Sequence, residues 1–301
     1  MRWPLNGRVA VMRRLYAYGL LLPAAAAVFF LVVYPLLRIL ELSLREGRMM
    51  NFARISELPL GLGNYRRVLG DPAFWNSVSV SAIYVGGSVA IAFLIGLATA
   101  LLLNRNLPGR RWLRTLLLLP WAVPGVIAGI VFLWMLDSSF GVVNAMLRDI
   151  GLLEGDHPWF VDRRTALVAV MVPTIWKAYP LITLTLLAAM QSIPDTLYEA
   201  AWIDGARAWQ AFVHITWPGI QGAAILVVMI SVLWVFREID IIFAATRGGP
   251  ARATETLAVY VYNEAFQYFR MGVASAVGTL MVGLALLVSL LAVALARRDR
   301  F

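Results

Sequence analysis

Residues 191–218 read QSIPDTLYEAAWIDGARAWQAFVHITWP, a patterned connection between two long apolar stretches. Asp195 or Thr196 can cap a short helix, because their side-chain oxygens accept hydrogen bonds from the free backbone N–H groups of a helix start. Glu199 would then lie in the first turns, near the positive end of the helix dipole. The first half of the connection therefore predicts a short, capped helix.

The second half of the connection predicts a turn and another short helix. Gly205 breaks the first helix, since glycine adopts backbone conformations that other residues avoid. A helix over residues 209–215 would end before Pro218. The apolar side chains of the connection cannot all be solvated comfortably, which leaves two readings: an amphipathic helix lying on the bilayer, or a surface buried in a partner protein. These side chains are Leu197, Trp202, Ile203, Trp209 and Phe212.

The composition of the whole chain predicts a membrane protein. Of 301 residues, 61% are hydrophobic and 14% are charged, whereas soluble proteins carry about 25% charged residues. Six charge-poor stretches are long enough to cross a bilayer, and the first is too long for a cleaved signal peptide. They cover residues 15–37, 78–103, 115–136, 165–190, 219–245 and 271–296. We therefore expect an all-α polytopic membrane protein, with a further short helix over residues 142–150.

Several classes of function are excluded by residues that the sequence lacks. There is no cysteine, and the two histidines, His157 and His214, are far apart, so neither a catalytic constellation nor a metal site is expected. The one lysine, Lys177, is not part of a Walker A loop. Any ATP hydrolysis must therefore belong to another chain. No basic soluble region suggests binding of nucleic acid.

The arginines give a weak orientation signal. With the amino terminus inside, twelve arginines fall on inside segments and eleven on outside segments, which decides nothing by count. Density is more informative, because four arginines lie within residues 104–114 and three within the last five residues. We expect segments 1–14 and 297–301 to be cytoplasmic, with one membrane domain over residues 15–296 between them.

Lys177 lies in the middle of the fourth apolar stretch, flanked by Pro173 and Pro180. An unpaired ammonium costs several kcal/mol there, on the order of 3 by insertion scales, and the prolines predict a kinked or locally opened helix. Two interpretations remain open. Lys177 forms a buried ion pair with Glu238 or Asp240, or it binds an anionic group of a transported solute together with Arg237.

The spacing in residues 199–218 resembles the EAA signature of binding-protein-dependent ABC importer permeases. That signature is Glu-Ala-Ala, three residues, Gly, nine residues, Ile, one residue, Leu-Pro. Here Trp217 stands in place of the leucine. Three further stretches resemble sugar permeases of the maltose type: residues 62–65 with 71–77, residues 119–124 with 140–144, and residues 246–250.

This resemblance implies a fold, a function and a set of partners. The fold is the six-helix type I ABC importer permease, with a cytoplasmic coupling helix between helices 4 and 5 within residues 191–218. The partners are a second homologous permease subunit, a dimer of ATPase subunits that bind ATP and Mg²⁺, an extracytoplasmic solute-binding protein and membrane lipid. The chain would be a multi-pass protein of the bacterial inner membrane that imports a sugar or sugar-like solute, with no cofactor of its own.

The resemblance also implies two sets of site residues. The residues that couple to the ATPase are Glu199, Ala200, Ala201, Asp204, Gly205, Ile215 and Pro218. The residues along the substrate path are Trp176, Lys177, Ala178, Tyr179, Leu181, Ser231, Trp234, Val235 and Glu238. The aromatic members Trp176, Tyr179 and Trp234 can stack on sugar faces. The rival interpretations are a stand-alone carrier or channel, which the lack of an internal repeat disfavours, and a membrane-embedded enzyme.

Overall fold

The computed structural model describes residues 7–46, 57–105 and 108–298, and these residues are almost entirely helical. Residues 1–6 and 299–301 of the predicted cytoplasmic ends lie outside this part. The helices are α1 (Gly7–Val28), α2 (Tyr34–Ser43), α3 (Gly63–Gly70), α4 (Pro72–Leu103), α5 (Arg110–Leu117), α6 (Leu119–Ala122), α7 (Gly125–Met135), α8 (Val142–Asp149), α9 (Ala166–Met190), α10 (Asp195–Ile203), α11 (Ala208–Ala211), α12 (Trp217–Phe236), α13 (Asp240–Ala245), α14 (Leu257–Tyr262) and α15 (Met271–Arg298). Three π-helical turns join them: η1 (Phe29–Val33), η3 (Phe212–Thr216) and η4 (Asn263–Gln267).

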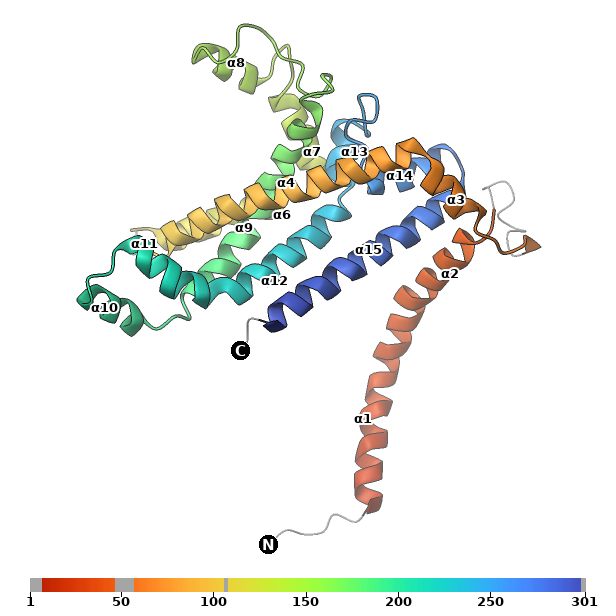
Figure 1. Cartoon of the computed structure of the whole chain (residues 1–301), viewed down its shortest axis with the longest axis horizontal. Coiled ribbons are helices and arrows are strands. Elements are labelled where there is room, and N and C mark those ends of the chain that lie inside the picture. The colour runs from red at the N-terminus through yellow and green to blue at the C-terminus, as the bar shows by residue number, and fades with distance from the viewer. Residues whose placement is uncertain (1–6, 47–56, 106–107, 299–301) are drawn as a thin grey trace. The chain divides into compact units, whose positions relative to one another are not determined.

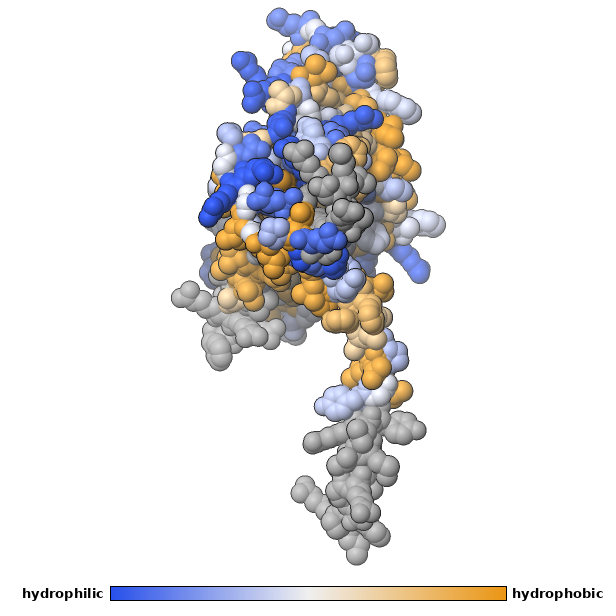
Figure 2. All heavy atoms as spheres, turned by 90° about the vertical axis from the view of Figure 1, so that its right-hand side faces the viewer, coloured by the Kyte–Doolittle hydropathy of each residue, from blue (hydrophilic) through white to orange (hydrophobic). Residues whose placement is uncertain are grey.

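Five helical segments of the described chain are long and apolar enough to cross a membrane, and a bent pair adds a sixth if it is counted as one span. The five are Tyr18–Ser43, Pro72–Leu103, Ala166–Met190, Ala208–Phe236 and Met271–Leu291. The predicted all-helical polytopic fold is confirmed. In Figure 2 apolar side chains cover much of the visible face, as expected for a protein whose solvent is partly lipid.

The predicted third span, residues 115–136, is not one straight helix. The arm formed by α5 and α6 ends at Ala122, and α7 continues at an angle of 94° to that arm. Val123 is extended at the break, with φ of −71° and ψ of 129°, because a residue before a proline avoids the helical region. Pro124 then precedes α7. The short helix predicted over residues 142–150 is confirmed as α8.

Contacts divide the chain into two units, one comprising residues 1–68 with 264–280 and the other residues 69–263 with 281–301. In the first unit the buried amide of Asn64 donates to the carbonyls of Ser43, at 3.0 Å, and Arg45, at 2.8 Å. Gly272 at the start of α15 permits this packing, because a Cβ there would lie 2.5 Å from the Arg45 carbonyl oxygen.

The second unit is a bundle in which α4, α9 and α12 pack along one another (Figure 1). Its core includes the fully buried side chains of Ile182, Leu186 and Ile220. Gly96 brings α4 close to α9, since a Cβ there would lie 2.7 Å from the Cγ2 atom of Ile182. The bundle thus fixes α9 and α12, which carry most of the predicted substrate-path residues.

Helix α9 runs without a break from Ala166 to Met190, with Pro173 and Pro180 inside it and with α4 and α12 packed against it; the kink or local opening expected at these prolines stays a prediction. The prediction for Pro218 is wrong. The helix after Gly205 does not end before Pro218 but continues into α12. Pro218 occupies the first turn of α12, where a missing N–H is tolerated, and the preceding π-turn lets the Trp217 N–H bond to the Phe212 carbonyl.

Candidate functional site

The connection between α9 and α12, here called the coupling loop (residues 191–218), folds into two short helices at one end of the bundle (Figure 1). Helix α10 begins after Pro194, which makes no side-chain cap, so the predicted caps by Asp195 or Thr196 are wrong. Asp195 instead lies in the first turn, where its charge faces the positive helix end.

Gly205 ends α10 as predicted, with a left-handed φ of 76°. The Gly205 N–H donates to the Trp202 carbonyl at 3.0 Å, and the Ala206 N–H to the Ala201 carbonyl at 2.8 Å. This pair of bonds is a Schellman motif, in which glycine carries no steric cost. The turn between α10 and α11 is therefore closed by backbone bonds that depend on Gly205.

The two halves of the coupling loop are also tied by side chains. The Tyr198 hydroxyl on α10 lies 3.0 Å from the Thr216 hydroxyl in η3. The Arg207 backbone N–H donates to the Gln210 side chain at 2.7 Å, which caps α11. Since η3 continues into α12, the hydroxyl pair joins α10 to a helix that is long and apolar enough to cross a membrane.

A notch of about 300 Å³ lies in the angle between α10 and the following helix. Four of the seven predicted coupling residues line it: Ala201, Asp204, Gly205 and Ile215. The other lining residues are Ala206, Gln210, Ala211 and His214. Glu199, Ala200 and Pro218 are exposed outside the notch.

The outer face of the coupling loop is apolar and uncovered. Ile203 is 87% exposed, Trp209 71% and Trp202 66%. The Trp209 ring stacks on Phe212 at 5.5 Å, with an angle of 26° between the rings. Exposed tryptophans beside a rigid notch are typical of protein-binding surfaces.

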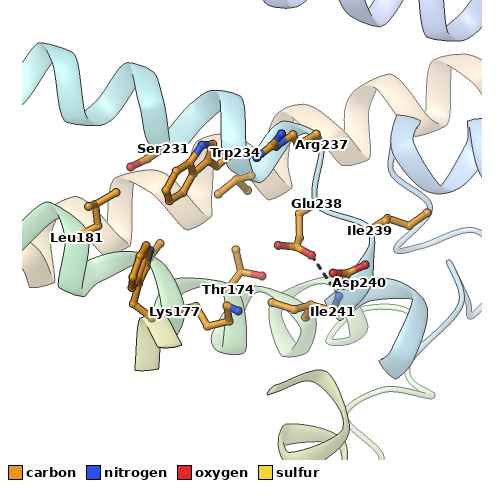
Figure 3. Close-up of a pocket in the computed structure, with 13 residues that line it drawn as sticks. Thr174, Lys177, Leu181, Ser231, Trp234, Arg237, Glu238, Ile239, Asp240 and Ile241 are labelled. Atoms are coloured by element: carbon orange, nitrogen blue, oxygen red, sulfur yellow. Dashed lines mark hydrogen bonds between the residues drawn. The ribbon is translucent and has the colours of Figure 1, made fainter. Parts of the chain in front are cut away.

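A second site is a pocket of about 360 Å³ formed by α9, α12 and the segment that follows α12 (Figure 3). Seven of the nine predicted substrate-path residues line it: Lys177, Ala178, Leu181, Ser231, Trp234, Val235 and Glu238. The remaining lining residues are Trp121, Thr174, Arg237, Ile239, Asp240 and Ile241.

Trp176 and Tyr179 do not line the pocket. The Trp176 ring packs against Phe132 at 5.6 Å, and Tyr179 packs against the bundle core. Helical periodicity explains the difference, because positions 174, 177, 178 and 181 share one face of α9. The same periodicity could have identified Thr174 from the sequence. Nothing in the sequence joined Trp121 to this set, since it comes from the broken third span.

Lys177 donates a hydrogen bond to the backbone carbonyl of Val123, at the break in the third span. Among the residues that the structure describes, no ion pair within 4.0 Å joins Lys177 to Glu238 or Asp240. The ion pair considered from the sequence is therefore not formed in this conformation. The bent third span instead supplies the carbonyl oxygen that accepts one hydrogen bond from the ammonium.

The acidic side of the pocket lies beyond the carboxyl end of the span that contains α12. Burial raises the pKa of Glu238, opposed by a hydrogen bond of 3.4 Å from the Ile241 backbone N–H. The neighbouring charge of Asp240 raises this pKa further, and Lys177 lowers it. The pocket thus presents two carboxylates, two basic groups and two tryptophans to a bound molecule.

Comparison with known proteins gives the class to which this chain belongs. Residues 92–300 match the family described as binding-protein-dependent transport system inner membrane component. The chain is 34% identical to the sulfoquinovosyl glycerol transport system permease protein SmoG of Agrobacterium fabrum, over 92% of this chain and 88% of the relative. It is 35% identical to the trehalose/maltose transport system permease protein MalF of Thermococcus litoralis, over 85% of this chain and 83% of the relative.

The fold matches a chain in the crystal structure of a bacterial ABC transporter that imports the acidic polysaccharide alginate. The TM-score is 0.83 at 23% identity, covering 97% of this chain and 98% of that chain. The family match and the two relatives, rather than this likeness in fold, establish the class. The chain belongs to the family of binding-protein-dependent transport system inner membrane components, as a multi-pass permease subunit of an ABC importer whose ATP is bound by separate subunits.

Proposed function

We propose that this chain forms half of the translocation path of a carbohydrate importer and that its pocket between α9 and α12 contacts the sugar. The observation that carries the proposal is the lining of this pocket, where Trp121 and Trp234 accompany charged groups. Tryptophan offers a flat apolar face, which suits the C–H face of a sugar ring. Carboxylates accept hydrogen bonds from sugar hydroxyls, and Lys177 and Arg237 can donate them.

The same proposal assigns the coupling loop to a separate ATPase subunit. A second permease subunit completes the path, and ATP and Mg²⁺ belong to the ATPase dimer. An extracytoplasmic binding protein delivers the solute. Both chain ends and the coupling loop lie in the cytoplasm. This arrangement is supported by the exposed apolar face of the loop and by its continuity with α12.

Alanine variants of the two pocket tryptophans test the sugar-contact assignment. Trp121→Ala and Trp234→Ala should each lower uptake of the cognate sugar about tenfold, since an aromatic contact contributes roughly 0.5–1.5 kcal/mol beyond its buried area. The solute is found first by a ligand screen on the cognate binding protein, with maltose, trehalose and diacetylchitobiose as probes. Uptake is then measured in proteoliposomes that contain the whole complex.

Trp134→Ala is the matched control. Trp134 is 60% exposed on α7 and does not line the pocket. Equal losses in all three variants would show a general effect on folding, and unchanged uptake in both pocket variants would contradict the proposal.

An anionic sugar is a second candidate, favoured by the state of Lys177. Its ammonium bonds to a neutral carbonyl and not to a carboxylate, so its charge is available to a solute. SmoG, named for sulfoquinovosyl glycerol transport, is a relative. Lys177→Met should lower uptake of sulfoquinovosyl glycerol about tenfold to a hundredfold, because hydrogen bonds to charged groups contribute roughly 1.5–3 kcal/mol. Uptake of neutral maltose should change little.

The comparison of the two probes separates the interpretations of Lys177. If uptake of the anionic probe survives the substitution, Lys177 does not bind an anion and serves to brace the break in the third span. If the uptake of both probes falls equally, Lys177 has a structural role and does not bind the anionic group.

A further inference from the structure

Helix α5 opens the bent third span with an unusual charge distribution. Arg110, Arg111 and Arg114 lie within it, and Arg105 follows the end of α4. The sequence contains no aspartate or glutamate between Asp71 and Asp137. Figure 1 shows the carboxyl end of α4 at the same end of the bundle as α10 and α11.

The helix is amphipathic. Positions 110, 111 and 114 share one side, because residues three and four apart are neighbours on a helix. Trp112, 76% exposed, and Leu116, 57% exposed, lie on the other side. Leu117 packs against the bundle core and fixes the helix to the second unit. Basic and apolar faces on one short helix are typical of segments that lie at a membrane surface.

Arg114 gives this surface a specific binding feature. Its side chain is half-buried, and its Nε and Nη2 atoms are shielded from solvent without a hydrogen-bond partner among the described residues. Arg111, three residues earlier, forms no ion pair within that part of the chain. Shielded guanidinium donors without acceptors are costly, and neighbouring like charges add to the cost. An anion beside Arg111 and Arg114 would offset the repulsion between these neighbouring like charges.

We propose that α5 binds the headgroup of an anionic phospholipid. The phosphate oxygens accept hydrogen bonds from the exposed side chain of Arg111, and the negative charge offsets that of the half-buried Arg114 three residues later. Guanidinium and phosphate match in geometry as well as in charge. The acyl chains cover Trp112 and Leu116.

A phospholipid fits better than the other anions that could bind. Free phosphate would neutralise the arginines but would leave Trp112 and Leu116 in water. An acidic protein surface would supply charge but would need its own apolar patch to cover those side chains. The bilayer supplies both chemistries at the end of a membrane span. This inference does not depend on which solute the importer carries.

The test compares affinity for phosphatidylglycerol with affinity for phosphatidylcholine. The whole complex is placed in nanodiscs of phosphatidylcholine, and binding of a spin-labelled phosphatidylglycerol is measured by titration. In the double variant Arg111→Gln/Arg114→Gln the affinity should fall about thirtyfold, since each arginine near an anionic membrane contributes roughly fivefold. Spin-labelled phosphatidylcholine should bind weakly to both forms.

Two further variants serve as controls. Arg66→Gln/Arg67→Gln removes the same charge from exposed positions on α3 and should leave the affinity unchanged. Arg111→Lys/Arg114→Lys keeps the charge but not the planar guanidinium and should recover only part of the affinity. Both are checked for an intact complex by size-exclusion chromatography.

Three outcomes would overturn the proposal. Equal affinities in the glutamine variant and the wild type would show that these arginines do not contribute to lipid binding. Full competition by inorganic phosphate at concentrations matching the lipid would show a simple anion site. Loss of the ATPase subunit from the glutamine variant in lipid-free detergent would show that this face binds protein.

Discussion

Gly205→Trp is expected to leave membrane insertion intact and to reduce binding-protein-stimulated ATP hydrolysis by at least about thirtyfold, the loss typical of a hot-spot residue worth roughly 2 kcal/mol or more. Gly205 closes α10 with a φ of 76°, where a side chain is strained. A Cβ at this position meets no atom within 4 Å. A bulky side chain would therefore stand in open space beside the notch that Gly205 lines, where we propose that the ATPase subunit docks.

Two control substitutions separate strain from obstruction. Gly205→Asn tests the backbone, because asparagine tolerates the left-handed region, and it should retain most of the stimulated hydrolysis. Gly222→Trp places the same large side chain on α12, where an added Cβ also meets no atom within 4 Å, and should be nearly neutral. Stimulated ATPase activity at the wild-type rate in the Gly205→Trp complex would disprove a docking role for this turn.

Glu199→Lys is expected to have a comparable effect through charge. Glu199 is exposed on α10 and forms no ion pair within the described part of the chain. Its carboxylate is therefore available to a basic side chain of the ATPase. Breaking a buried charge pair at an interface costs roughly 2–5 kcal/mol, so the affinity of the permease for the ATPase should fall by about thirtyfold or more. Pull-down of the ATPase from detergent solution measures it.

The control for charge reversal lies on another exposed loop. Glu154→Lys changes an exposed carboxylate between α8 and α9 in the same way and should leave ATPase binding unchanged. Glu199→Gln should give an intermediate affinity. If the ATPase binds Glu199→Lys as well as the wild type, Glu199 does not form the proposed pair, and the apolar face around Trp202 must carry the docking.

The coupling loop shows which features could be predicted from neighbouring residues in the sequence. Its two helices and the turn at Gly205 could be predicted, because glycine readily adopts the left-handed backbone conformation that ends a helix. The predicted cap by Asp195 and the predicted helix end before Pro218 were wrong, because both predictions relied only on the residues next to the expected helix ends. The π-turn η3, which begins at Phe212, shifts the backbone hydrogen bonds so that Pro218 fits into the first turn of α12.

The pocket shows which features could not be predicted from neighbouring residues in the sequence. The family resemblance implied contacts on α9 and α12, and these helices supply Lys177 and Trp234. Trp121 could not be assigned, because an apolar run of 22 residues, 115–136, reads as one straight span whether or not it bends. The break at Val123 both brings Trp121 to the pocket and supplies the carbonyl that binds Lys177.

The sequence by itself determined that this protein is helical and partly surrounded by lipid, and it predicts the docking segment. Low charge and long apolar runs require lipid around helices, since only internal hydrogen bonding satisfies the backbone there. The spacing from Glu199 to Pro218 marks the coupling loop. Only the tertiary structure decided which groups share the pocket and which partner Lys177 has. Those answers depend on a bend of 94° in the third span. Pro124 accounts for the break, but the direction in which α7 continues depends on its packing against α13, which is distant in sequence.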